Sequence, residues 1–292
     1  MQGRDRGLVL LVPILWGLNF PATALALEHY PPLLAAALRF LLMLPALLFV
    51  PFPKVPLRWL IGTGVGLGVV QFSFLYIGIA AGMPVGLASL VLQASAPFTI
   101  LLAVLFLGER MTPRRLAGVA LAVLGLAIIG ASRALSAAWL PMALTLLAAF
   151  GWAIGNVSAR LARAPDPLQL TMWMAVVPPL PLLALSLLIE RPLIGPALAG
   201  ALHPQAIPAN LGLAYIVVFS TVIGYGIWNA LMARYPASEV APWSMLVPIV
   251  GIASSWAVFG EIPRPLELAA GLLVIGGVIL ASRPPRRPEL RG

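Results

Sequence analysis

Ten apolar stretches, each close to the length of a membrane-spanning helix, fill the sequence between residues 8 and 282. A bilayer needs about 20 predominantly apolar residues to be crossed by one helix. The segments between the stretches are short and carry proline, glycine and charge, which favour turns. We therefore predict an all-α polytopic membrane protein with ten transmembrane helices, at residues 8–27, 32–50, 59–81, 85–107, 114–131, 136–158, 168–189, 209–233, 238–259 and 265–282.

The stretches form two sets of five, and the second set repeats the first. The segment from Ile77 to Ser89 matches the segment from Gly226 to Ser238, five stretches later. Because five is an odd number, the second set must cross the membrane in the opposite direction. Two inverted repeats around a central cavity are typical of alternating-access transporters, with a binding site near the middle of the bilayer.

Composition restricts the class of protein further. The chain is 61% hydrophobic and 9% charged, whereas a soluble domain has about 25% charged residues, so we expect the excess apolar surface to contact the lipid bilayer. Cysteine is absent, which excludes disulfides and thiolate metal sites. The net charge of +9 comes from basic residues scattered singly in loops, so we expect no nucleic-acid partner. No phosphate-binding Gly-Lys-Ser or Gly-Lys-Thr occurs, and we expect no cofactor and no metal.

The distribution of Lys and Arg predicts the orientation, because cytoplasmic loops carry the excess of these residues. With the N-terminus inside, the inner segments hold 14 of them and the outer segments 3. Both termini are thus predicted to be cytoplasmic. The inner set is Arg4, Arg6, Lys54, Arg58, Arg110, Arg114, Arg115, Arg160, Arg163, Arg234, Arg283, Arg286, Arg287 and Arg291, and the outer set is Arg133, Arg191 and Arg264.

Individual residues of the two halves correspond. The matched pairs are Trp16 with Trp152, Asn19 with Asn156, Tyr76 with Tyr225, Gln93 with Ser244, Pro97 with Pro248, and Leu107-Gly108-Glu109 with Phe259-Gly260-Glu261. On these residues the chain resembles the drug/metabolite transporter superfamily, in its ten-helix branch of two EamA-type repeats. The repeats would be residues 1–132 and residues 133–292, the second ending in a short basic cytoplasmic tail.

Within that branch the chain most resembles bacterial amino-acid exporters, including the aromatic amino-acid exporter type. The resemblance implies a multi-pass protein of the bacterial inner membrane that exports amino acids and related small metabolites and is not an enzyme. We expect it to act as a monomer. Another cargo, such as a drug, a sugar phosphate or a nucleotide sugar, stays open at this point, and so does a membrane-embedded enzyme.

Polar and aromatic residues inside the apolar stretches are candidates for the substrate site, because in lipid such side chains must face the bundle interior. Trp16 and Asn19 share one helical face of the first stretch, and Thr221, Tyr225, Trp228 and Asn229 share a face of the eighth. The alternative role is hydrogen bonding between helices or anchoring at the interface. The candidates are Trp16, Asn19, Gln71, Tyr76, Gln93, Asn156, Trp173, Tyr225, Trp228, Asn229 and Ser244.

Arg39 is the one basic residue predicted to lie deep within a span. A central arginine costs about 3 kcal/mol on the insertion scale, and no acidic residue lies deep in any span to pair with it. Its forked guanidinium would suit a substrate carboxylate. The alternative is a structural arginine bound to helix-end carbonyls.

Glu109 and Glu261 each follow a glycine at a predicted helix end, near basic residues, and recur in both halves. We therefore expect them to have a structural role at the interface rather than to carry protons.

Overall fold

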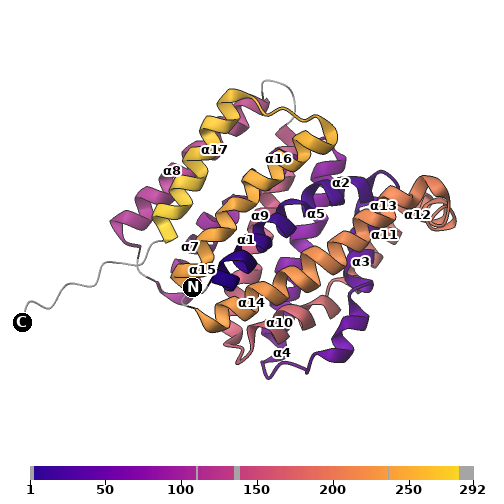
Figure 1. The fold of residues 1–292 in the computed structure, drawn as a ribbon, viewed down its shortest axis with the longest axis horizontal. Coiled ribbons are helices and arrows are strands. Elements are labelled where there is room, and N and C mark those ends of the chain that lie inside the picture. The colour runs from indigo at the N-terminus through magenta and orange to yellow at the C-terminus, as the bar shows by residue number, and fades with distance from the viewer. Residues whose placement is uncertain (1–2, 110, 135–138, 236, 283–292) are drawn as a thin grey trace, which may run out of the picture.

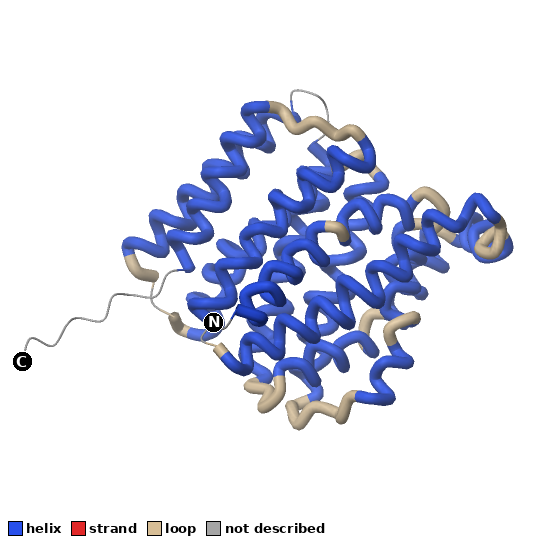
Figure 2. The backbone as a smooth tube through the Cα atoms, in the orientation of Figure 1, coloured by secondary structure: helices blue, strands red, loops and turns tan. Residues whose placement is uncertain are grey.

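The computed structural model describes residues 3–109, 111–134, 139–235 and 237–282. Across these ranges the chain is helical and forms no β-strand (Figure 2). The predicted all-α class is thus confirmed for the described part of the chain. The basic tail predicted at the C-terminus, residues 283–292, lies outside it.

The helices follow one another along the chain and pack into one bundle (Figure 1). In chain order the α-helices are α1 (Gly3–Gly17), α2 (Asn19–Leu27), α3 (Pro32–Leu41), α4 (Leu57–Gly64), α5 (Gln71–Ala80), α6 (Val85–Val91), α7 (Ser95–Leu107), α8 (Pro113–Ala134), α9 (Trp139–Ala162), α10 (Pro167–Trp173), α11 (Pro179–Ile189), α12 (Arg191–Ala199), α13 (Ile207–Tyr215), α14 (Gly224–Arg234), α15 (Ala237–Val240), α16 (Val247–Phe259) and α17 (Pro265–Ser282).

Short turns of other helical geometry join several of them. The tighter 3₁₀ turns are η1 (Leu44–Phe49), η3 (Leu92–Ala94), η4 (Met174–Val176), η5 (Pro204–Ala206) and η7 (Ala241–Leu246), and the wider π turns are η2 (Val65–Val70) and η6 (Ile216–Ile223).

Among the described residues, 8 continuous helical stretches are long and apolar enough to cross a membrane. They coincide with the first eight predicted spans, and two shorter apolar helices, Trp243–Phe259 and Pro265–Ala281, lie where the ninth and tenth are predicted. Large apolar side chains cover the outside of the bundle: Leu48 is 85% exposed, Phe49 88% and Leu180 78%. Exposed apolar surface of this extent, on helices long enough to cross a bilayer, fits contact with lipid. The eight stretches are Arg4–Leu27, Pro32–Phe49, Leu57–Ala80, Val85–Leu107, Pro113–Ser132, Trp139–Ala162, Pro167–Ile189 and Pro204–Arg234.

Proline explains several of the breaks inside these stretches. A proline has no N–H to bond the carbonyl four residues earlier, so the regular helix is interrupted there. Pro21 follows the boundary between α1 and α2, Pro97 follows η3, and Pro248 follows η7. The boundaries of the helices therefore lie near these three prolines, and Pro97 and Pro248 are a matched pair of the sequence repeat.

The connections alternate between two ends of the bundle. We call them the His29 end, with the turns at residues 28–31, 81–84, 190–206 and 260–264, and the Lys54 end, with the N-terminus and the connections at residues 50–56, 108–112 and 163–166. The long connection after residue 190 is not irregular but forms α12, which projects from the side of the bundle (Figure 1). The His29 ring bonds the Ala197 carbonyl at 2.9 Å and ties α12 to the turn after α2.

Glycines let helices approach to backbone contact. A Cβ placed on Gly66 would lie 2.3 Å from the backbone nitrogen of Gly155 on α9, and one on Gly118 would lie 2.6 Å from the Gly277 carbonyl oxygen. The third stretch thus packs closely against α9 within this chain. The contact between Gly118 and Gly277 joins α8 to α17, which run side by side at one edge of the bundle (Figure 1).

Adjacent glycines of α17 allow a matched test of this packing. A Cβ on Gly277 would lie 2.5 Å from the Ala122 nitrogen, whereas a Cβ on Gly276 would meet nothing within 4 Å. Gly277→Ala should therefore destabilise the protein by about 1–3 kcal/mol through overpacking. Gly276→Ala should leave stability unchanged or raise it by up to about 1 kcal/mol, because alanine favours helix. Apparent melting temperatures of the two variants in detergent measure the difference, and equal values would contradict the packing described here.

Candidate functional site

Arg39 lies in the last turn of α3, inside the bundle. Three consecutive alanines, Ala35 to Ala37, are fully buried just before it, and small residues of this kind let neighbouring helices come close. Arg39 itself is only 5% exposed. Arg39 therefore faces the interior of the bundle and not its outer surface.

The Arg39 guanidinium is surrounded by one ring face and two hydroxyls. Its carbon lies 3.9 Å from the centre of the Phe72 ring, a cation–π arrangement. Nη1 donates to the Tyr76 hydroxyl at 3.4 Å, and Nη2 donates to the Thr221 hydroxyl at 3.3 Å. Both hydrogen bonds are longer than the usual 2.7–3.2 Å, so these partners hold the guanidinium weakly.

The charge of Arg39 has no counter-charge in the described part of the chain. No carboxylate there lies within ion-pair distance of the guanidinium, and its Nε–H has no hydrogen-bond partner among the described residues. Leaving a buried charge unpaired costs several kcal/mol. A ligand carboxylate would supply the missing charge and can accept two parallel hydrogen bonds from one guanidinium.

The π turn η6 presents polar groups beside Arg39. The Thr221 hydroxyl donates to the Ile216 carbonyl, five residues earlier, at 2.8 Å. The Trp16 indole Nε1–H donates to the Ser220 carbonyl at 3.0 Å. A π turn interrupts the α-helical bonding pattern and often occurs at functional sites. Here it fixes the side chain of Thr221 and joins α1 to the eighth apolar stretch.

An aromatic wall, consisting of Trp16, Tyr225 and Trp228, adjoins this turn. The Trp16 ring lies 5.0 Å from the Tyr225 ring and 5.2 Å from the Trp228 ring, at tilted angles. All three rings are half-buried, and Tyr225 follows by one helical turn Thr221, whose hydroxyl bonds Arg39. The predicted faces of the first and eighth stretches thus contact each other next to the guanidinium.

Asn19 adds a hydrogen-bond acceptor one turn along from Trp16. Its side chain is buried, and its Oδ1 has no partner among the described residues. The Thr23 hydroxyl bonds the Asn19 backbone carbonyl at 2.8 Å, so it does not use this oxygen. An amide carbonyl of this kind can accept a hydrogen bond from an ammonium group.

Other predicted residues bond between helices. The Gln93 amide nitrogen lies 3.5 Å from the Met245 sulfur, which brings Gln93 to the residue next to its repeat counterpart Ser244. The Asn156 amide donates to the Thr99 hydroxyl at 3.2 Å and joins α9 to α7. The contact of Asn156 agrees with the alternative role of hydrogen bonding between helices.

Three predicted residues lie apart from the Arg39 group or bond locally. The Trp173 indole donates to the Val50 carbonyl at 2.9 Å, toward the Lys54 end, and its ring lies 5.0 Å from that of Phe52. Asn229 bonds the Tyr225 carbonyl of its own helix at 2.8 Å. Gln71 is buried at the start of α5, where its backbone nitrogen adjoins Gly151 of α9.

Phe72 is a site residue that sequence analysis missed. As an apolar residue in an apolar stretch it carries no polar signal, although it lies four residues before Tyr76 and so shares its helical face. Its ring also packs edge-on against Tyr76 at 5.6 Å. The four-residue spacing from Tyr76 was the only indication in the sequence that Phe72 lies at this site.

Two carboxylates cap helix N-termini at the His29 end. Glu190 accepts hydrogen bonds from the backbone N–H groups of Leu33 at 2.9 Å and Leu34 at 3.1 Å. Glu261 accepts from those of Val85 and Gly86, both at 3.0 Å. A carboxylate is favoured there, because the first N–H groups of a helix lack intrahelical partners and its dipole is positive at that end.

Glu109 instead forms ion pairs at the Lys54 end. Its carboxylate binds Arg115 at 3.0 Å and also accepts a hydrogen bond from Arg160 of α9. The Arg160 hydrogen bond is the main cause that lowers the pKa of Glu109, and burial opposes it. These contacts agree with the structural role expected for Glu109 and Glu261.

Comparison with known proteins identifies the family. The sequence profile of the EamA-like transporter family matches residues 7–131 and residues 139–283. A protein of Salmonella typhimurium, named "Probable amino-acid metabolite efflux pump", is 43% identical over 96% of this chain and 95% of its own length. A protein of Escherichia coli with the same name is 39% identical over 96% of this chain and 95% of its own length.

Two more distant matches agree with this family assignment. A "Probable terminal-alkyne amino-acid exporter" of Streptantibioticus cattleyicolor is 31% identical over 69% of this chain and 65% of its own length. One solved crystal structure shares the fold, with a TM-score of 0.56 at 20% identity over 97% of this chain and 98% of that one. With its apolar helices and these matches, the chain is a multi-pass membrane transporter and belongs to the EamA-like transporter family.

Proposed function

We propose that this transporter exports amino acids and related small metabolites across the bacterial inner membrane by alternating access. The observation that carries the proposal is the buried guanidinium of Arg39, which has no counter-charge among the described residues and lies between an aromatic ring and two hydroxyl groups. The names of the relatives that match nearly the whole chain support an amino-acid cargo.

The proposed architecture has ten spans in two inverted halves, residues 1–132 and 133–292. Repeated local features support it. Gly108 and Gly260 both end a helix with a positive φ, of 66° and 68°, which glycine adopts without strain. The π turns η2 and η6 occur in the third and eighth stretches, each shortly before a matched tyrosine. In this architecture the two halves enclose a site that opens to each side in turn.

The substrate carboxylate binds Arg39 in this proposal. It replaces the two long hydroxyl contacts with a bidentate, charge-assisted pair and supplies the missing charge. The Nη1 and Nη2 groups now directed to Tyr76 and Thr221 are the donors available for this pair.

The rest of an amino acid has complementary groups on α1, α2 and α14. The unpaired Oδ1 of Asn19 accepts a hydrogen bond from the ammonium group. The aromatic wall of Trp16, Tyr225 and Trp228 accommodates an apolar or aromatic side chain. A polar site with a single cation fits a zwitterion better than a phosphate, which attracts several basic groups.

Transport of amino acids by the purified protein in liposomes tests the function. We expect counterflow of neutral amino acids without ATP, because the proposed site holds one cation for the carboxylate and neutral groups for the rest. The assay covers all twenty amino acids, with a pH gradient imposed in a parallel series. If the protein transports a drug or a sugar phosphate but none of the amino acids, the proposed cargo is wrong.

Arg39→Lys tests the carboxylate site. Lysine keeps the charge but lacks the fork, so the apparent affinity for amino acids should fall by about tenfold to a hundredfold, or about 1.5–3 kcal/mol. Competition by amines that lack the carboxylate should change much less. Arg58→Lys is the matched control, because Arg58 is exposed at the Lys54 end and lies 5.2 Å from the Trp59 ring. Equal losses for acids and amines, with a lowered melting temperature, would make Arg39 a structural residue.

Single cysteines in this cysteine-free chain test the orientation. The bias of 14 basic residues to 3 supports cytoplasmic termini, with the His29 end outside. Glu28 and Lys54 are both exposed, at opposite ends of the bundle. Glu28→Cys should react with an impermeant thiol reagent added to intact cells, and Lys54→Cys should react only after lysis. The reverse labelling pattern would show that the proposed orientation is wrong.

A further inference from the structure

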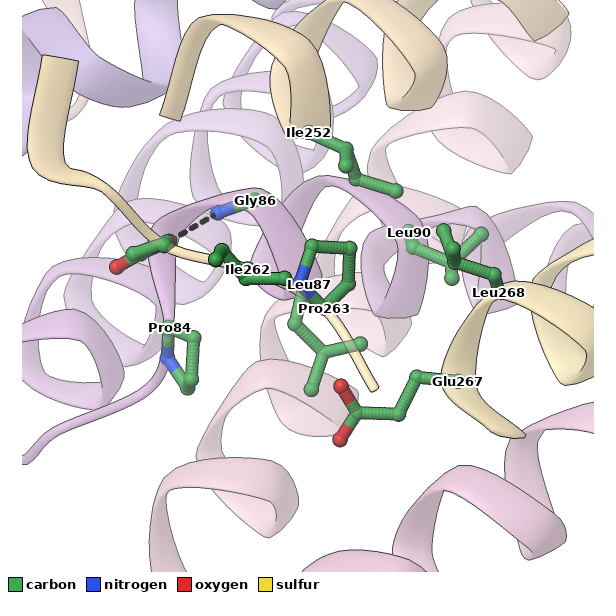
Figure 3. Close-up of a pocket in the computed structure, with 10 residues that line it drawn as sticks. Pro84, Gly86, Leu87, Leu90, Ile252, Ile262, Pro263, Glu267 and Leu268 are labelled. Carbon is green, nitrogen blue, oxygen red and sulfur yellow. Dashed lines mark hydrogen bonds between the residues drawn. The ribbon is translucent and has the colours of Figure 1, made fainter. Parts of the chain in front are cut away.

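A carboxylate joins the two halves of the transporter at the His29 end. Glu261 follows α16, and its two oxygens each accept one backbone hydrogen bond, from Val85 and Gly86 in the first turn of α6, at 3.0 Å. The bond to Gly86 is dashed in Figure 3. Hydrogen bonds to an ionised acceptor are roughly twice as strong as neutral ones. The connection after the ninth stretch is therefore fastened to the beginning of the fourth.

Next to this contact, α6 and α16 pack closely against each other. A Cβ on Gly251 would lie 2.5 Å from the Ser89 hydroxyl, and a Cβ on Gly86 would lie 3.1 Å from the Ile252 Cα. The Ser89 hydroxyl donates to the Gly86 carbonyl at 2.6 Å and lies 3.4 Å from the Pro248 carbonyl. Ser89 is 1% exposed. The seam between α6 and α16 is closed at this end of the bundle.

A small cavity lies beside the Glu261 contact. Its volume is about 30 Å³, and Pro84, Leu87, Pro263 and Glu267 are among the residues that line it (Figure 3). A space of this size holds about two water molecules. Water there can solvate the Glu261 carboxylate when it leaves the α6 amides, so the contact can open without exposing an unsolvated charge.

The repeat counterpart of Glu261 is bound differently. Glu109 also follows a glycine with positive φ, yet its carboxylate pairs with Arg115 and Arg160. Equivalent carboxylates thus have different partners at the two ends of the bundle. A difference of this kind suits alternating access, in which one side is shut while the other is open.

We propose that Glu261 is the latch that holds the outer side of this transporter shut, and that its release from the first turn of α6 opens the seam between α6 and α16. This inference rests on the proposed alternating access and orientation. It assigns Glu261 a role in positioning the helices and not in binding the cargo.

A cysteine at position 89 reports on the seam. Ser89→Cys is a nearly isosteric change, and in the closed seam its thiol is buried. Adding Glu261→Gln removes the charge and leaves one acceptor oxygen for two N–H groups. The rate of labelling by an impermeant thiol reagent from outside should then rise about tenfold, which corresponds to about 1.4 kcal/mol. The measurement uses intact cells without added amino acids.

Two further variants isolate the latch. Val85→Pro removes one N–H donor at the first position of α6, where proline is tolerated, and leaves Glu261 intact. It should raise the labelling rate by a smaller factor. Glu190→Gln is the control, because it removes an equivalent cap between the end of α11 and α3, away from the seam. Substitutions at distant sites act almost independently, so the labelling rate should stay within about twofold of that of the parent. Melting temperature and size-exclusion profile verify that each variant is folded.

Labelling at the parent rate in both folded variants, Glu261→Gln and Val85→Pro, would overturn the latch. An equal rise in the labelling rate with Glu190→Gln would also overturn the latch, because a general loosening of the helix packing would then explain the effect of Glu261→Gln. The outcome does not depend on the cargo. A rise in labelling in a protein that moves no amino acid would retain the latch and reject only the proposed cargo.

Discussion

The exclusion of water from the bundle is the constraint on which the other features depend. In lipid, each polar group needs a partner within the protein, and the described residues meet this need with side chains from distant helices. Among the exceptions are the Asn19 Oδ1 and Arg39, whose charge is flanked by the Phe72 ring and two hydroxyls. Such an arrangement tolerates a cation and at the same time leaves it able to bind an anion. The site is therefore defined by an incomplete set of interactions.

Helix ends are satisfied in a way that links the halves. Glu190 lies at the end of α11 and caps α3, and Glu261 follows α16 and caps α6, so each carboxylate comes from the second half and each capped helix from the first. A carboxylate cap supplies two hydrogen bonds and a favourable charge at one position. It can be released as a unit, whereas an apolar interface of similar strength would have to separate over its whole area.

The sequence predicted the features that depend on composition and spacing along one helix. Span positions follow from apolar length, and the faces of Trp16 and Tyr225 follow from helical periodicity. It did not predict the π turns, which depend on how a helix packs against its neighbours. Nor did it separate Trp173 from the central group, because a tryptophan at a helix end and one in a cavity have the same local pattern.

Arg39 also connects the proposed binding step to the proposed motion. Its two hydroxyl partners belong to different halves, since Tyr76 lies on α5 and Thr221 lies on η6. A ligand shifts a conformational equilibrium only when it binds one state more strongly than the other. A carboxylate on Arg39 replaces contacts to both halves, so its affinity depends on how far apart the halves hold these hydroxyls. The side chain that we propose to recognise the cargo is thereby sensitive to the relative position of the two repeats.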